Sequence, residues 1–310
     1  RPVGSVRLLP IRGGLPTRGR VERGSFRPAS RHTCRFQPTT QEVTLAMRQF
    51  VTAALASVFV LIAPQVVQAQ PTIDGDLGDS EYATIATKQG SNTGFGNTTL
   101  SSIVKYVDVG NSKIYLGVKG ELTTSSGNGV GVWVNVAGNG SPSGRSPGTS
   151  LAVSGAGHYI SGNGGGNPNF SADFEVDAMY AFNTGGSSSD VYFDAANVTG
   201  GSPSATFVGT ADQSGTLTTG TGPGGETIEF AVNNAGGTDQ GIEIGIPFSE
   251  LGATQDMQIE VFVMEVSGSA YFSDLTVPGE LPSEPGFDVN FNSLSGGPYN
   301  SGSSPLPVEL

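Results

Sequence analysis

From residue 70 onward the sequence is a series of short, alternating apolar segments separated by glycine-rich turns. In GIEIGIP (241–247) and GVGVWVNV (129–136), β-branched residues occupy every second position. This period of two is typical of β-strands with one face in a core, and no segment keeps a helical period beyond about one or two turns. We therefore predict an all-β fold, an antiparallel, jelly-roll-like β-sandwich with long Gly/Ser-rich loops. The expected strands are 102–109, 113–122, 129–136, 172–182, 189–195, 226–232, 241–247 and 258–266.

The same period predicts which side chains face the core. Ile242, Ile244 and Ile246 point to one side of their strand, with Glu243 on the other. In 129–136 the valines share one face, and Trp133 and Asn135 lie on the opposite face. The segment QIEVFVMEV is apolar on both faces apart from its glutamates, which indicates a central strand covered on two sides.

The first 69 residues differ from the rest and indicate export. From Met47 a basic residue, an apolar stretch (50–63) and the small-x-small site Val67-Gln68-Ala69 follow one another, as in a secretory signal peptide. A membrane-spanning helix needs about 20 apolar residues, and Pro64 interrupts the run. We therefore expect a protein that does not span the membrane after signal removal, and that is secreted or on the outer cell surface.

Four segments follow from these patterns. Residues 1–46 carry nine arginines and no apolar period, so we expect a spurious upstream or disordered segment. Residues 47–69 are the predicted signal peptide, and 70–296 are a single β-sandwich domain. The Pro/Ser/Gly-rich end, 297–310, is predicted to be a linker to a further C-terminal region.

Charge excludes one class of partner. Ten of the 15 basic and two of the 27 acidic residues lie in the first 69 positions. Residues 70–310 therefore carry five basic and 25 acidic side chains, a net charge of −20, which would be repelled by nucleic acid. Such a surface suits a saline habitat or divalent cations. The single cysteine, Cys34, lies in the leader, so the remaining chain has no thiol or disulfide chemistry.

The stretch TIDGDLGDSEY (72–82) concentrates carboxylates just behind the leader. Asp74, Asp76 and Asp79 do not keep the alternating spacing of an EF-hand. We expect TID to end a first strand and Asp79-Ser80-Glu81 to open a short helix, where acidic residues meet orphan N–H groups, with Tyr82 then entering the core. The alternative is a calcium site in which Asp74 or Asp76 acts with ligands distant in sequence.

A second acidic cluster, ADFEVDAMY, suggests an enzyme as an alternative. Asp173, Glu175 and Asp177 would alternate on one strand face, about 7 Å apart, the range of a glycosidase carboxylate pair. Jelly-roll endoglucanases carry a third carboxylate, but Met179 and Tyr180 stand in its place. We therefore favour a solvated acidic strand face and predict that the protein is not an enzyme.

Three residues are candidates for ligand contact. Trp133, the only tryptophan, faces away from the valine stripe and could stack on a sugar ring, with Asn135 beside it. The alternative is a second apolar layer under a loop. Tyr159 is the third candidate; its neighbour His158 is the only histidine after the leader, which excludes a His-rich zinc site.

Several motifs point to one family. IDGDLGDSEY, KIYLGVKGEL and GIEIGIPFSELG resemble the opening, following strand and late strand of β-sandwiches similar to the family 9 carbohydrate-binding module and the DOMON-like domains. NTGFGN, ADFEVDAMYAF, AYFSDLTVPGELP and PLPVEL resemble secreted Bacteroidota-type proteins in which such a sandwich precedes a type IX secretion sorting domain. The resemblance implies export by that route and a role in surface binding.

We therefore expect a non-catalytic extracellular or cell-surface binding module for glycan, with calcium as a candidate ligand. One alternative is a jelly-roll glycoside hydrolase that uses Glu175 and Asp177. Another is a structural surface or adhesion sandwich without a small ligand. The sequence predicts no oligomeric state.

Overall fold

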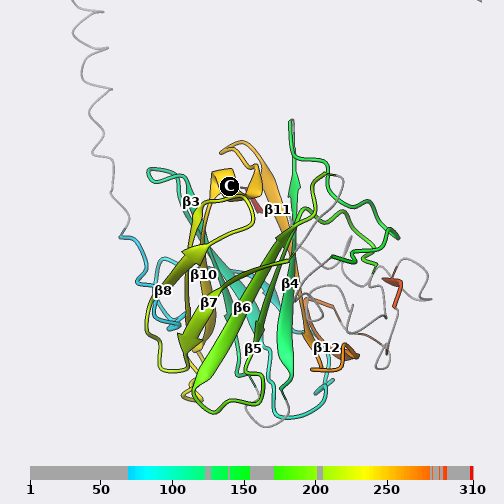
Figure 1. Cartoon of the computed structure of the whole chain (residues 1–310). Coiled ribbons are helices and arrows are strands. Elements are labelled where there is room, and N and C mark those ends of the chain that lie inside the picture. The colour runs from blue at the N-terminus through cyan, green and yellow to red at the C-terminus, as the bar shows by residue number, and fades with distance from the viewer. Residues whose placement is uncertain are drawn as a thin grey trace, which may run out of the picture. The chain divides into compact units, whose positions relative to one another are not determined.

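Two antiparallel sheets packed face to face build the fold and confirm the predicted β-sandwich (Figure 1). The computed structural model describes residues 69–122, 127–138, 140–153, 171–200, 205–279, 281, 286 and 289–291, and the backbone of 308–309. The predicted upstream segment and nearly all of the predicted signal peptide lie outside these residues, as do His158 and Tyr159. None of the described helices has the length and apolar character needed to cross a bilayer.

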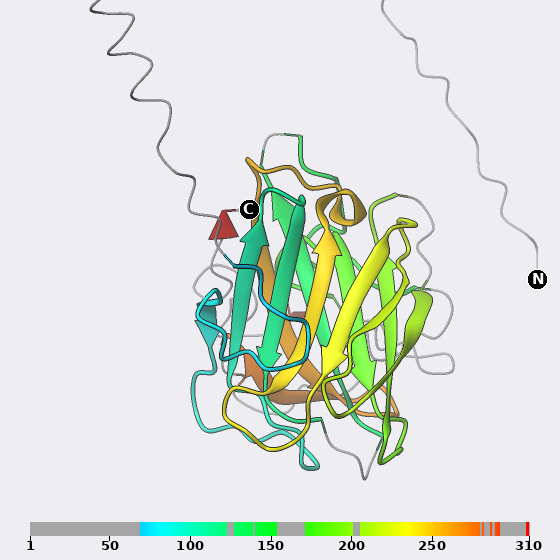
Figure 2. The ribbon, with the colours of Figure 1, turned by 90° about the vertical axis from the view of Figure 1, so that its left-hand side faces the viewer.

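The first sheet runs in the order β1-β2-β3-β10-β9-β8, and the second in the order β12-β11-β4-β5-β6-β7. The turned view in Figure 2 shows the first sheet in front of the second. The first sheet comprises β1 (Ala83–Thr87), β2 (Ser102–Asp108), β3 (Lys113–Lys119), β8 (Thr218–Thr221), β9 (Thr227–Val232) and β10 (Gly241–Pro247). The second comprises β4 (Gly129–Ala137), β5 (Ala178–Asn183), β6 (Asp190–Asn197), β7 (Ala205–Asp212), β11 (Gln258–Val266) and β12 (Phe272–Val277).

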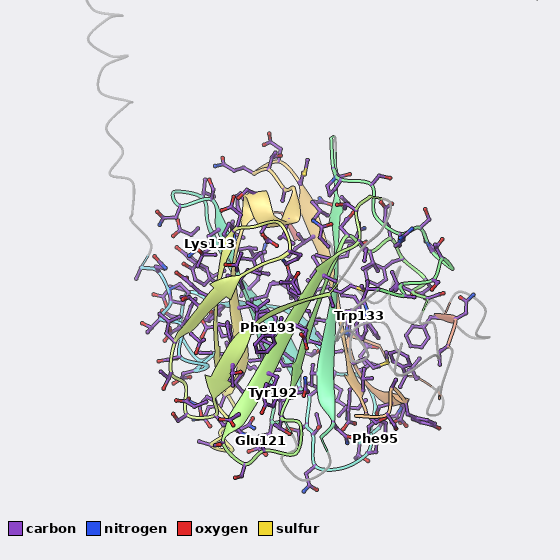
Figure 3. The ribbon with its side chains drawn as sticks, viewed as in Figure 1. Phe95, Lys113, Glu121, Trp133, Tyr192 and Phe193 are labelled. Atoms are coloured by element: carbon purple, nitrogen blue, oxygen red, sulfur yellow. The ribbon has the colours of Figure 1, made fainter. Side chains whose placement is uncertain are left out.

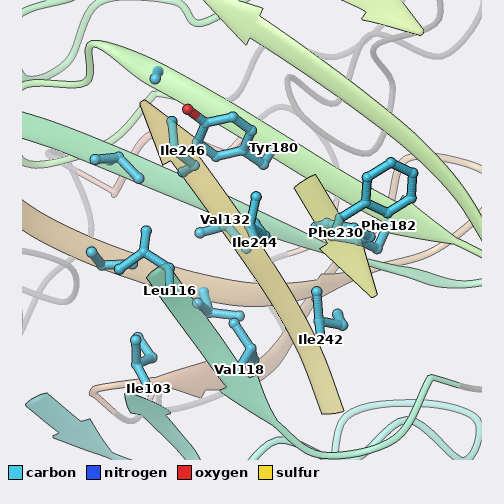
Figure 4. Close-up of a cluster of buried hydrophobic side chains, with 14 of the residues drawn as sticks. Ile103, Leu116, Val118, Val132, Tyr180, Phe182, Phe230, Ile242, Ile244 and Ile246 are labelled. Carbon is cyan, nitrogen blue, oxygen red and sulfur yellow. The ribbon is translucent and has the colours of Figure 1, made fainter. Parts of the chain in front are cut away.

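The main core fills the space between the sheets, and it confirms the predicted strand faces. Alternate residues of β3, β4, β9 and β10 meet there (Figure 4). Aromatic rings extend it toward β6, where Phe193 stacks on Phe182 with ring centroids 4.3 Å apart and meets Phe230 edge-on. The labelled members in Figure 4 are Ile103, Leu116, Val118, Val132, Tyr180, Phe182, Phe230, Ile242, Ile244 and Ile246.

A second apolar layer covers the outer face of the second sheet. Trp133 is fully buried in it and its ring packs 5.7 Å from that of Phe262. Residues from the segments around Phe174 and Phe291 cover these strands from outside. The central strands β4 and β11 are therefore buried on both faces, as the pattern of QIEVFVMEV predicted.

A third, smaller apolar cluster covers the outer face of the first sheet. There Ile73 and Tyr82 of the segment 70–82 pack with Tyr106 and Tyr115. Leu77 lies over Gly117 of β3, where a Cβ atom would come within 2.5 Å of Leu77 Cδ2. Glycine at this position therefore makes room for the segment, which we call the N-terminal strap.

Buried carboxylates fasten the loops to this frame. Glu250, in the short helix α3 (Phe248–Leu251), accepts hydrogen bonds from the backbone N–H groups of Gly224 and Glu226. Glu265 of β11 accepts one from the N–H of Phe95 at 3.0 Å. Burial raises the pKa of the Glu265 carboxyl to about 7, although the N–H of Phe95 and neighbouring side chains act in the opposite direction.

Five strands were not predicted, and the strand predicted at 172–182 is shorter. β1, β7, β8 and β12 are absent from the expected set; β8 has the polar sequence TTGT and forms a sheet edge. The segment 172–177 is not part of β5, which begins only at Ala178. Residues 308–309, expected in a linker, form the short strand β13 (Val308–Glu309), which pairs with β11.

Candidate functional site

The carboxylates of Asp74 and Asp76 are used inside the N-terminal strap. Asp74 Oδ1 accepts the N–H of Asp76 at 2.8 Å, and Asp76 Oδ1 accepts the N–H of Gly78 at 3.1 Å. These contacts are local turns that any short acidic side chain can make. No group of three possible metal ligands occurs among the residues that the structure describes.

Beneath the strap lies Glu243 of β10, fully buried. Its Oε2 accepts the N–H groups of Asp74 and Gly75 at 3.0 and 2.9 Å, and Oε1 accepts the hydroxyl of Tyr82. Burial raises the pKa of the Glu243 carboxyl to about 7, partly offset by these three hydrogen bonds. The N-terminal strap therefore covers the outer face of the first sheet and is held there by Glu243.

Three expectations for this stretch are wrong. No helix begins at Asp79: the N–H of Tyr82 bonds to the carbonyl of Asp79 in a turn, and the chain then enters β1. The residues of TID form a bend rather than a strand. Tyr82 packs on the outer face of the first sheet instead of entering the main core. Carboxylate and tyrosine partners distant in sequence hold this segment. Its conformation therefore depends on these contacts and not on local helix propensity.

The second acidic cluster lies on the outer side of the second sheet, covered by the segment around Gly144. Asp177 is 1% exposed, and its Oδ2 accepts the N–H of Val136 at 2.7 Å. Glu175 Oε1 accepts the N–H of Gly144 at 2.9 Å. Burial raises the pKa of the Asp177 carboxyl to about 7. The expected open row of three carboxylates on one strand is therefore wrong, because β5 begins only at Ala178, after all three residues.

Asn135 lies next to this cluster, whereas Trp133 points into the apolar layer. The amide of Asn135 donates to Glu260 Oε2 at 2.8 Å, and Asn135 is itself buried. Because Trp133 is fully buried in the second apolar layer, its placement matches the alternative of a layer under a loop rather than a surface ring for stacking. Asp177 contacts Val136, the neighbour of Asn135 in β4, and Asp74 and Asp76 lie on the other sheet.

An exposed aromatic pair lies elsewhere, on β6 and β7. Among the described residues, large hydrophobic side chains are exposed at Val109, Tyr192, Phe207 and Leu217. Tyr192 is 37% and Phe207 is 56% exposed, and both belong to neighbouring strands (Figure 3 labels Tyr192). The other two lie in separate turns.

Strand register puts both rings on the same side. Val191 and Phe193 point into the main core, so Tyr192 and Asp194 point outward. β7 carries an extra residue at a bulge, after which Phe207 pairs directly with Asp194. Tyr192 and Phe207 are therefore diagonal neighbours on one surface. We call this surface the β6–β7 face; its outward residues are Asp190, Tyr192, Asp194, Phe207, Thr210 and Asp212.

Asp194 stands directly opposite Phe207 and two positions after Tyr192 on β6, and one of its carboxylate oxygens lacks a partner. It is 5% exposed, and its Oδ1 is buried without any hydrogen-bond partner. Burial raises the pKa of this carboxyl to about 6. On β5 the residue opposite is Ala181, whose small side chain offers no hydrogen bond.

A hollow of different character lies near the end of β3. Its volume is ≈ 360 Å³ and Glu121 is the charged residue in its wall. Lys119, next in the chain to Gly120, is held by Asp239 at 2.6 Å. The lining residues are Thr99, Ser101, Gly120, Glu121, Gly236, Gly237 and Thr238. None of these lining residues is aromatic.

No protein-family model, no curated protein and no solved structure matches this chain. The resemblance to the family 9 carbohydrate-binding module and DOMON-like domains therefore stays a prediction. The β6–β7 face was missed because only β6 was predicted. The alternation in DVYFDA does place Tyr192 opposite Phe193 and thus outside the core, but Phe207 belongs to a strand that the sequence did not indicate.

Proposed function

We propose that this protein is a non-catalytic extracellular or cell-surface binding module for glycan, and that the β6–β7 face is its contact surface. The observation that carries the proposal is the exposed pair of Tyr192 and Phe207 on neighbouring strands. Aromatic rings offer the apolar face of a sugar a flat partner, and the tyrosine hydroxyl remains available for hydrogen bonds. Thr210, directly opposite Tyr192, adds a second hydroxyl.

The backbone that carries Tyr192 and Phe207 is well packed. The strands beneath it bury Val191, Phe193 and Ala195 in the main core. Gly185, in the turn before β6, lies against the Tyr192 ring, where a Cβ atom would come within 3.0 Å of Cε2. Side chains held in this way lose little freedom on binding, which favours affinity.

The extracellular part of the proposal rests on the signal-peptide pattern that ends at Ala69. The non-catalytic part is supported by the state of the acidic cluster. Asp177 is almost completely buried, and Gly144 covers its Oδ1 so closely that a Cβ there would be only 2.5 Å away. A general acid must reach the glycosidic oxygen within hydrogen-bond distance, and this carboxyl does not face an open cleft.

A glycan array probed with the purified protein, with calcium and with chelator, tests the proposal. We expect binding to one or more glycans and its loss in both Tyr192→Ala and Phe207→Ala. Leu217→Ala is the matched control, because it removes an equally exposed apolar side chain outside the β6–β7 face. Retained binding in both aromatic variants would refute the location. A protein that binds no glycan would instead fit the structural or adhesion alternative.

A further inference from the structure

The β6–β7 face combines its aromatic rings with negative charge, and neither of the two ion pairs found among the described residues involves it. Asp190, Asp194 and Asp212 share the outward side of the two strands with Tyr192 and Phe207. The sequence contains no lysine or arginine after Arg145. Lys113 and Lys119 are bound to Glu229 and Asp239 in the first sheet and the loop beside it.

Two of these carboxylates stand directly opposite each other. Asp190 of β6 pairs with Asp212 of β7, an arrangement in which like charges repel. Their donors are uncharged: Ser187 and Ser189 donate to Asp190, and Ser214 donates to Asp212. Hydrogen bonds from Thr216 and Ser214 lower the pKa of Asp212 to about 2, so this end of the face keeps its charge at neutral pH.

The third carboxylate, Asp194, is a neighbour of both rings in the strand register and has an unpartnered Oδ1. A buried acceptor without a donor lowers stability, and a ligand that supplies a donor would recover that free energy. The faces of Tyr192 and Phe207 attract cations through their electron-rich π systems. The carboxylates and the rings therefore both favour a ligand group that is positively charged and donates hydrogen bonds.

We propose that the β6–β7 face selects glycans that carry protonated amines, such as oligomers of glucosamine, over neutral and anionic glycans. This selectivity rests on the proposed function and specifies its substrate class. A sugar ammonium brings three donors and a positive charge to the carboxylates, while the apolar face of the ring lies on the aromatic pair. Sulfated or uronic-acid glycans meet like charge on this face and are repelled.

Calorimetry with three oligosaccharides of equal length tests the selectivity, at a pH at which the amines are protonated. The three are oligomers of glucosamine, of N-acetylglucosamine and of glucose. We expect the glucosamine oligomer to bind about tenfold more tightly than the other two, equivalent to about 1.4 kcal/mol. Raising the salt concentration from about 0.05 to 0.5 M should weaken only this oligomer, because the charges lie near the surface.

Asp194→Asn is the decisive variant and should bring the affinity ratio close to one. Asp256→Asn is the matched control, since it removes one exposed negative charge in the turn before β11 and should keep the ratio. Equal affinities of the wild type for all three oligomers would overturn the selectivity and leave glycan binding standing. A preference that survives Asp194→Asn would overturn it as well. Binding of none of the three would overturn the selectivity, and the proposed function would then fail only if the glycan array showed no binding either.

Discussion

We expect the protein to become less stable as the pH rises above about 4.5. Replacing Glu243 by glutamine should make this loss of stability smaller. Burial raises the pKa of this carboxyl from 4.5 to about 7 in the folded protein. A raised pKa means that the folded state holds the proton more tightly than the unfolded state, so the stabilisation is complete below about pH 4.5 and is lost as the pH rises through 7. At 1.36 kcal/mol per pH unit the loss is about 3 kcal/mol.

Glutamine keeps the shape of the site and does not titrate. Its oxygen can accept the N–H groups of Asp74 and Gly75, and its amide can donate to the Tyr82 oxygen. Between pH 4.5 and 8 the wild type should therefore lose about 3 kcal/mol more of its free energy of unfolding than Glu243→Gln does. Any constant cost of the substitution cancels in this comparison.

Urea unfolding at constant ionic strength measures the difference, with the fluorescence of the single, fully buried Trp133 as the signal. Asp256→Asn, which removes one exposed negative charge, is the control for the change in net charge. Asp177 and Glu265, whose pKa values are also raised to about 7, should still destabilise the variant over the same range. A difference that does not change between pH 4.5 and 8 would refute the reasoning.

Four further outcomes are expected. Trp133→Ala should cost about 3 to 5 kcal/mol in urea unfolding followed by circular dichroism, because the ring is fully buried against Phe262; a cost below about 1 kcal/mol would contradict its place in the second layer. Reducing-sugar assays should detect no hydrolysis of β-glucan, xylan or laminarin, and activity that disappears in Glu175→Gln would reverse this. Calcium should raise the melting temperature no more than sodium chloride of equal ionic strength, since backbone N–H groups occupy Asp74 and Asp76; an extra rise that is lost in Asp76→Asn would identify a calcium site. N-terminal sequencing of the secreted protein should begin just after Ala69, and a start within residues 1–46 would contradict the signal peptide.

The strand faces could be predicted because they depend only on neighbours two positions apart. Ile244 and Val132 point into the main core as their alternation required. The polar strand β8 could not be predicted from its sequence, because TTGT shows no apolar alternation. It forms because it pairs with β9 at the edge of the sheet. The start of β5 at Ala178 was missed because Val176, two positions earlier, pairs with Arg145 and not with a strand of the sheet.

The candidate site was harder to predict than the fold. Trp133 was correctly placed opposite the valines, but sequence alone did not show that distant segments cover that side. Glu243 was likewise assigned to the outward face without its partners, which are about 170 positions away along the chain. The pairing of Phe207 with Asp194 depends on a bulge, and a shift of one residue there would have turned the ring to the other side.

The N-terminal strap has a consequence for the order in which the chain folds. A chain is synthesised from its N-terminus, yet Asp74 is separated from its anchor Glu243 by 169 positions. The strap must therefore wait until β10 has been made, and closing so long a loop is slow. Until then Tyr115 and Ile73 stay open to water, and such exposed apolar surface favours aggregation. The strap, which precedes every described strand in the sequence, is thus among the last segments to reach its native contacts.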